Sequence, residues 1–275
     1  MYADTLDNFA AVAEKKAAVI RRHPLPFLVS AMMAGAYVGL GIILIFSVGA
    51  TLDPSVRRLV MGASFGIALT LVIFAGSDLF TGHTMFMTIG RLRRRVTTVD
   101  LASSWTLSWL GNLAGATALA WLFVAGGGGA LLSDGAPLLQ KAAAAKMNAS
   151  AGELFARAIL CNWLVCLAIW MAARTTSDAA KLGVIFWCLF AFIASGYEHS
   201  VANMTLFSIA LLAEHGEAVS LAGMAHNLLW VTLGNAVAGG LFMAAGYWYA
   251  SKPALVSTAP VAPAAAAALA QAPGR

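Results

Sequence analysis

The chain has 275 residues, of which 60% are hydrophobic and 11% are charged. Soluble domains carry about 25% charged residues, so this composition excludes an ordinary soluble domain and indicates an integral membrane protein with one membrane domain. The net charge of +5 does not indicate nucleic-acid binding, because the basic residues lie in loops between apolar segments, where they set membrane topology.

Residues 1–24 are predicted to form an N-terminal amphipathic surface helix. Apolar side chains recur at helical spacing between Thr5 and Arg22, and charged side chains occupy the other positions. We expect such a helix to lie on the membrane surface with its apolar face toward the lipid. Pro24 and Pro26 separate it from a membrane domain that we expect over residues 25–252.

Six apolar segments follow, each long enough to cross a hydrocarbon core of about 30 Å. They cover approximately residues 27–50, 59–90, 101–125, 153–173, 179–213 and 221–250. Polar residues next to glycines interrupt the second segment at 76–84 and the fifth at 195–204. Unwound backbone at membrane depth is tolerated only where protein or a wet cavity satisfies it. The fold class is therefore an all-α membrane protein of six transmembrane helices, with the second and fifth spans interrupted.

Both termini of a six-span chain lie on the same side of the membrane. Twelve Lys and Arg residues fall on that side and five on the other. The excess of positive charge on cytoplasmic loops predicts that both termini are cytoplasmic. Residues 253–275 are rich in Ala and Pro and predict a disordered tail.

The interruption in the fifth span places Glu198 next to His199. Ionisable side chains at membrane depth are costly and by default face a bundle interior or a water path. We interpret His199 as lying on the wall of a transport pathway. The alternative is a buried Glu–His pair that only holds two helices together. His83 follows the first interruption and is expected mainly to satisfy backbone groups.

The two halves of the chain resemble each other. Residues 75–81 correspond to residues 194–200, and Leu110-Gly-Asn112 corresponds to Leu233-Gly-Asn235. Three spans separate each pair, so the two halves have opposite orientations in the membrane. Interrupted segments at matching positions of inverted halves indicate a transport site at the midplane.

Four blocks of the sequence resemble, in order, the signatures of the formate/nitrite transporter family. They are AGSDLFTGHTM at 75–85, CNWLVCLAIW at 161–170, GYEHSVANM at 196–204 and NLLWVTLGN at 227–235. The resemblance covers approximately residues 5–250 and is closest to the bacterial nitrite channels within the family. It implies an aquaporin-like protomer with one pore, a homopentamer, and a location in the bacterial inner membrane.

The resemblance also implies roles for individual residues. His199 matches a central pore histidine that is held by Thr81 and Asn203, and Glu198 matches the carboxylate beside it. Asn162 and Asn235 match polar contacts on the cytoplasmic side, and Lys146 matches a basic residue near the periplasmic mouth. The residues that match an apolar constriction or line the pore with it are Phe65, Leu69, Leu79, Phe192 and Val165.

The function implied is transport of nitrite and related small monovalent anions across the lipid bilayer. No catalytic residue, metal or cofactor is expected, and Cys161, Cys166 and Cys188 lack metal-ligand spacing. Formate, hydrosulfide or lactate remain alternative permeants for the same fold. A haem-binding membrane subunit is a rival from another class, but only His199 is expected deep in a span. The sequence leaves open whether the protein behaves as a channel or as a proton-coupled carrier.

Overall fold

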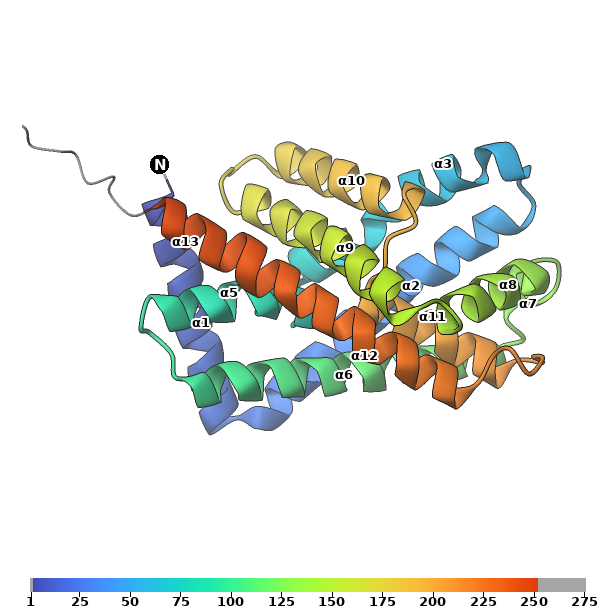
Figure 1. Ribbon diagram of the computed structural model, residues 1–275, viewed down its shortest axis with the longest axis horizontal. Coiled ribbons are helices and arrows are strands. Elements are labelled where there is room, and N and C mark those ends of the chain that lie inside the picture. The colour runs from blue at the N-terminus through green and yellow to red at the C-terminus, as the bar shows by residue number, and fades with distance from the viewer. Residues whose placement is uncertain (1, 252–275) are drawn as a thin grey trace, which may run out of the picture.

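The computed structural model describes residues 2–251, and every regular element in this range is a helix (Figure 1). The predicted tail over residues 253–275 lies outside the described residues. The elements are α1 (Ala3–Arg22), α2 (Pro24–Ala50), α3 (Pro54–Ser64), α4 (Gly66–Leu71), η1 (Val72–Gly76), α5 (Phe80–Leu92), α6 (Thr98–Ala125), α7 (Gly129–Leu132), α8 (Ala136–Met147), α9 (Ala151–Ala172), α10 (Asp178–Ala194), α11 (Ser200–Leu212), α12 (Leu221–Val237), η2 (Ala238–Ala245) and α13 (Gly246–Ala250).

Five continuous helical segments among residues 2–251 are long and apolar enough to cross a membrane. They are Pro24–Ala50, Pro54–Gly76, Thr98–Ala125, Ala151–Ala172 and Leu221–Ala250. The predicted fifth span falls instead on α10 and α11, which have 17 and 13 residues. Each is shorter than the roughly 20 residues that one crossing requires.

Several helices begin at residues whose side chains satisfy the first free N–H groups. Thr97 and Asp100 form a capping box at the start of α6, and Ser150 and Glu153 form one at the start of α9. Asp53 accepts from the Ser55 hydroxyl and N–H at the start of α3, and these bonds hold the pKa of Asp53 below its usual value. These signals make the helix starts readable from the sequence.

Helices α2 and α6 approach each other closely because glycines on each helix face the backbone of the other. A Cβ atom on Gly115 would lie 1.8 Å from the Met32 carbonyl oxygen, and one on Gly35 would lie 2.1 Å from the Asn112 carbonyl oxygen. Small residues permit such contact between membrane helices. The contact places Asn112 beside the end of η1, where it becomes part of the site.

The N-terminal helix α1 differs from the sequence expectation in what it contacts. Its apolar face, which includes Leu6, Phe9 and Ala10, is buried against α5, α9 and η2 of the same chain. Ion pairs fix its polar face, and Arg21 Nε donates to Asp100 Oδ1 at 2.7 Å. The amphipathic pattern was interpreted correctly as a helix. The expectation that its apolar face meets lipid was wrong, because the protein itself covers that face.

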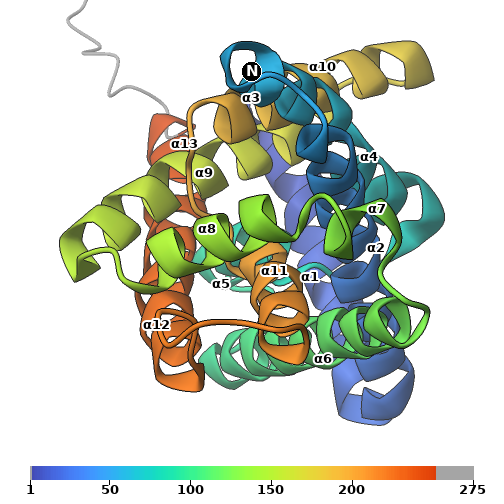
Figure 2. The same cartoon turned by 90° about the vertical axis from the view of Figure 1, so that its right-hand side faces the viewer.

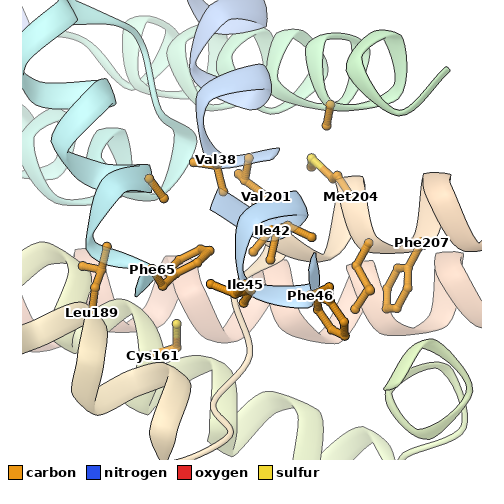
Figure 3. Close-up of a cluster of buried hydrophobic side chains, with 14 of the residues drawn as sticks. Val38, Ile42, Ile45, Phe46, Phe65, Cys161, Leu189, Val201, Met204 and Phe207 are labelled. Carbon is orange, nitrogen blue, oxygen red and sulfur yellow. The ribbon is translucent and has the colours of Figure 1, made fainter. Parts of the chain in front are cut away.

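The largest apolar core surrounds α2, α4, α10 and α11. In Figure 3 the side chains of Val38, Ile42 and Ile45 on α2 lie between Phe65 on one side and Met204 and Phe207 of α11 on the other. The ends of the bundle are distinct: α1 and α13 lie at one end, and α7 and α8 lie at the other (Figure 1). Figure 2 views the second end, with α8 in front of the bundle. Two short helices, α5 and α11, start inside the bundle.

Candidate functional site

The first break in a helix lies between η1 and α5. Gly76 has φ +78, and Ser77 N–H donates to the Val72 carbonyl at 3.1 Å. Asn112 of α6 then holds the extended backbone: its Nδ2 donates to the Asp78 carbonyl at 2.9 Å, and its Oδ1 accepts from Phe80 N–H at 2.8 Å. A positive φ favours glycine, and the amide satisfies two buried backbone groups that no helix could satisfy.

The second break, between α10 and α11, has the same construction. Gly196 has φ +74, and Tyr197 N–H donates to the Phe192 carbonyl at 3.0 Å. Asn235 of α12 donates from Nδ2 to the Glu198 carbonyl at 3.0 Å and accepts at Oδ1 from Ser200 N–H at 2.9 Å. Each asparagine therefore holds the two residues that flank one central position.

The two breaks correct the alignment of the halves by one residue. The sequence comparison paired Ala75 with Ala194, which would match Asp78 with Tyr197. The two positive-φ glycines instead match Gly76 with Gly196, and the asparagine contacts match Asp78 with Glu198. The backbone conformation fixes the register, because only the glycines can occupy the left-handed position without strain.

His199 occupies the central position of the second break. It is 4% exposed, and its Nε2 lies 3.1 Å from Thr81 Oγ1 of α5. Its Nδ1 accepts from Ala202 N–H at 3.2 Å, so the imidazole also caps α11. A backbone N–H can only donate, so Nδ1 carries no proton here and Nε2 carries the proton of a neutral ring. His199 is held as the Nε2–H tautomer.

An apolar constriction lies against one side of His199. A cavity of only about 10 Å³ is lined there by the histidine and by apolar side chains from four helices and the first break. All five residues expected at a constriction are among those lining it: Phe65, Leu69, Leu79, Phe192 and Val165. Phe65 and Phe192 meet edge to face at 5.3 Å between ring centroids.

A wider cavity of about 130 Å³ lies on the other side of His199. Lys146 and Asn203 line it, and Phe192 and His199 belong to both cavities. Lys146 Nζ lies 2.8 Å from Glu198 Oε2, which also accepts from Asn203 Nδ2 at 2.7 Å. Since a buried carboxylate needs a partner, the lysine and the amide compensate Glu198, which is 2% exposed.

A third cavity of about 380 Å³ lies where α1, η1, the end of α9 and the start of α10 meet. Ile73 and Ile169 line it, each one helical turn from a constriction residue, Leu69 and Val165. Phe9 of α1 forms another part of the wall. The continuous segment of α4 and η1, together with α9, thus contributes wall residues to both the constriction and this larger space.

Two predicted contacts are replaced by others. Asn203 does not hold the His199 ring: its Nδ2 bonds Glu198 and, at 2.9 Å, Asn227 Oδ1. Asn162 and Asn235, both fully buried, are not among the residues lining the described cavities. Asn235 bonds backbone groups of the second break. Asn162 Nδ2 donates to the Asn235 carbonyl at 2.6 Å and to the Thr84 hydroxyl at 3.1 Å. Both are positioning residues here, because their amide groups bond other parts of the protein.

The sequence did not identify the side chains around the first break. Asp78 is buried and lies 2.6 Å from Lys16 Nζ and 3.0 Å from His83 Nε2. His83 is buried and bonds side chains, which corrects the expectation that it satisfies backbone groups. The internal repeat could have identified Asp78, because aligning Gly76 with Gly196 matches Asp78 with Glu198. Among residues 2–251, no cluster of three His, Cys, Asp or Glu side chains could hold a metal ion.

The fold and the site define an all-helical integral membrane protein with a buried histidine between two cavities. A model of the formate/nitrite transporter family matches residues 3–249. The chain is 57% identical over 251 residues to the nitrite transporter NirC of Escherichia coli (strain K12), covering 91% of this chain and 93% of that one. It is 37% identical to a probable formate transporter of Methanothermobacter thermautotrophicus, covering 90% and 95% of the two chains.

Solved structures agree with the sequence relatives. An FNT family ion channel superposes with a TM-score of 0.87 at 56% identity, covering 90% of this chain and 99% of the other. A pentameric formate channel with formate bound gives a TM-score of 0.71 at 25% identity, covering 82% and 96%. The chain belongs to the formate/nitrite transporter family.

Proposed function

We propose that this protein conducts nitrite and related small monovalent anions across the bacterial inner membrane. The observation that carries the proposal is the position of His199, at the junction of a narrow apolar constriction and a wider cavity that Lys146 and Asn203 also line. The relatives support it, since NirC of Escherichia coli is described as a nitrite transporter. Transport rather than catalysis is the role, with no cofactor.

The proposed pathway runs through the three cavities in sequence. An anion would enter the 130 Å³ cavity beside Lys146, pass His199 and the constriction, and leave through the 380 Å³ cavity near α1. A cationic residue at a mouth raises the local concentration of anions. The constriction holds no space for a hydration shell, so an anion must lose most of its water there, which is costly without compensation.

His199 and Thr81 supply that compensation. The neutral ring offers its Nε2–H, and the Thr81 hydroxyl can donate once the ring donates to its oxygen. A permeating anion also favours a positive charge on the ring. The added proton must go to Nδ1, which would displace the Ala202 N–H. The His199 ring is therefore neutral when no anion is bound and gains a proton only when an anion is present. This links the movement of protons to the movement of anions in a channel-like pathway.

Six spans account for the arrangement of the helices. We assign one interrupted span to α3, α4, η1 and α5 and another to α10 and α11, in an inverted aquaporin-like repeat within a pore domain over 25–252. Tyr2 and Tyr247, near the two ends of the described chain, have ring centroids 5.1 Å apart. This proximity supports the assignment of both ends of the described chain to the same side, as an even number of crossings requires. The charge bias makes that side cytoplasmic.

Reporter fusions test the topology. A fusion after Ser251 is expected to report the cytoplasm, and one in the loop at 148–150, next to α8, is expected to report the periplasm. The reason is that α8 lies at the end of the bundle opposite α13 (Figure 1). The measurement is the activity of alkaline phosphatase and green fluorescent protein fused at each site. Equal reporter signals at the two sites would contradict six spans.

A homopentamer is the proposed assembly, supported by the pentameric formate channel that this chain resembles. Cross-linking of the purified protein in detergent, followed by mass determination, tests it. A series of bands ending at five copies is the expected result. A series ending at a smaller number would overturn the assembly without affecting the pathway through each protomer.

Thr81→Val is expected to reduce nitrite flux by roughly tenfold. The change keeps the shape of the side chain but removes the hydroxyl that bonds His199 Nε2 at 3.1 Å. One buried hydrogen bond contributes about 1 kcal/mol or more, and about 1.4 kcal/mol corresponds to a factor of ten. The measurement is the initial rate of uptake in proteoliposomes. Thr88→Val is the matched control, because Thr88 lies on the same helix and bonds only the Thr84 carbonyl.

The permeant itself is tested by competition uptake in proteoliposomes with nitrite, formate and hydrosulfide at several pH values. Nitrite is expected to be taken up fastest and to be displaced least by the others. Formate is the alternative permeant, favoured by the structural match to a channel with formate bound. Faster uptake of formate or hydrosulfide than of nitrite would reassign the substrate.

A further inference from the structure

The first break carries a polar cluster that the pathway described above does not use. We call it the Lys16 cluster; it consists of Lys16, Asp78, His83 and Ser104. Lys16 Nζ lies 2.6 Å from Asp78 Oδ1, and His83 Nε2 lies 3.0 Å from the same oxygen. His83 Nδ1 lies 2.6 Å from Ser104 Oγ. Asp78, His83 and Ser104 are buried, and Lys16 is one third exposed at 34%.

The second break carries a cluster of the same plan, the Lys146 cluster, which consists of Lys146, Glu198, Asn203 and Asn227. Asn203 follows its carboxylate by five residues, as His83 follows Asp78. Asn227 precedes its break-holding asparagine by eight residues, as Ser104 precedes Asn112. The two lysines come from α1 and α8, at opposite ends of the bundle (Figure 1).

The clusters differ in the residue that links the carboxylate to the neighbouring helix. Asn203 holds Glu198 in one cluster, and its amide cannot change charge between pH 5 and pH 8. His83 holds Asp78 in the other, and histidine is the side chain whose charge ordinarily changes in that range. The positive charge of Lys146 cancels the negative charge of Glu198, and Lys16 and Asp78 cancel in the same way. His83 alone therefore decides the net charge of the Lys16 cluster.

The contacts of His83 suit both protonation states. When the ring is neutral, Nε2–H donates to Asp78 and Nδ1 accepts from the Ser104 hydroxyl. When the ring is charged, Nδ1–H donates to the same hydroxyl, which can accept as well as donate. His199 differs, because its Nδ1 faces the backbone N–H of Ala202. A proton can therefore be added to His83 without moving its neighbours.

The surroundings of His83 contain no other ionisable partner among the described residues. Asp78 faces it from the break and Lys16 from α1. The ring centroid of Phe27 on α2 lies 5.4 Å from that of His83. From α6, Ser104 bonds the His83 ring and Trp105 Nε1 donates to the His83 carbonyl. The charge of the cluster thus changes from zero to +1 when His83 takes up a proton.

We propose that His83 makes the mouth at the α1 end sensitive to pH, whereas the Lys146 cluster, with Asn203 in the corresponding position, adds no such sensitivity at the other mouth. Protonation of His83 leaves Asp78 shared between two cations and adds a positive charge near this mouth, which draws anions toward it. Uptake from the α1 side therefore rises as the pH falls, over and above any change seen from the other side. This inference rests on the proposed anion transport, and His83 acts in it as a positioning residue.

The test compares the two faces of the protein. Initial rates of nitrite uptake are measured in right-side-out and in inside-out membrane vesicles from pH 5.5 to pH 8, with vesicles lacking the protein subtracted. The wild-type protein is expected to show an additional rise at low pH only when nitrite is presented at the α1 side. Equal pH profiles at the two faces of the wild-type protein would overturn the proposal without any variant.

Two substitutions locate the effect. His83→Asn copies the residue of the Lys146 cluster and is expected to remove the additional rise while uptake at pH 8 is retained. Ser104→Ala removes the acceptor of the charged ring and is expected to move the rise to lower pH. His215→Asn makes the same change as His83→Asn at an exposed loop residue and is expected to leave the profile unchanged.

The outcomes separate this inference from the proposed function. If either folded variant of the Lys16 cluster keeps the wild-type profile at the α1 side, His83 is not the group that titrates. If His83→Asn does not assemble, the profile of Ser104→Ala and the comparison of faces in the wild-type protein still decide the matter. Failure of the wild-type protein to take up nitrite at any pH would instead remove the proposed permeant.

Discussion

His199→Asn is expected to abolish the proton-linked component of nitrite uptake while the protein remains folded. Asparagine is a good helix N-cap, so it can still accept from Ala202 N–H, as Nδ1 of the imidazole does. It offers hydrogen bonds to an anion but cannot gain a proton near neutral pH. The variant loses the bond between the charged imidazolium and the anion, and hydrogen bonds to charged groups contribute about 1.5–3 kcal/mol, which corresponds to a loss of nitrite flux of roughly ten- to a hundredfold.

The measurement records nitrite uptake and internal pH together in vesicles that contain the variant. His226→Asn is the matched control, since His226 bonds the Ala149 carbonyl at 3.1 Å and is not among the residues that line the described cavities. Uptake of nitrite by His199→Asn with an unchanged ratio of protons to nitrite would mean that His199 only packs between helices. In that case the pathway would lose its central group.

Asn235→Leu is expected to destabilise the folded protein by about 2–6 kcal/mol. Leucine has a similar volume but would leave the Glu198 carbonyl and the Ser200 N–H without the partner that holds them now. Each buried polar group left unsatisfied costs about 1–3 kcal/mol. We also expect transport to be lost, because the same bonds fix the backbone on both sides of His199. The measurement is the midpoint of denaturation of the purified protein in detergent.

Asn112→Leu should produce a loss of similar size, because Asn112 makes the corresponding bonds to Asp78 and Phe80. Asn148→Leu is the control, since it removes an amide that bonds two carbonyls at the exposed end of α8. An Asn235→Leu protein as stable as the Asn148→Leu protein would show that the breaks hold their shape without the asparagines.

The sequence singled out the residues at the centre of the candidate site, because its strongest signals are local. Glu198 and His199 stand out in an apolar segment, and the family resemblance pointed to Thr81, whose hydroxyl lies at His199 Nε2. The expected constriction residues come from four separate elements, yet they line one cavity. Long apolar segments also located the membrane helices, and the starts of α6 and α9 carry recognisable caps.

The sequence did not predict contacts that depend on how the two halves align or on how helices pack against each other. A one-residue error in aligning the halves matched Asp78 with a tyrosine and hid its relation to Glu198. The docking of α1 could not be foreseen either, since a helix that is apolar on one face suits lipid and protein equally well. Lys16 reaches Asp78 only because α1 packs on α5, and no spacing in the chain records that contact.

The two asparagines touch only backbone at the breaks, which leaves the residue between their contacts free to vary. In one half that residue is Leu79, an apolar wall, and in the other it is His199, a titratable ring. The same freedom offers an engineer two exchangeable positions at the centre of the bundle, where new side chains could retune which ions pass.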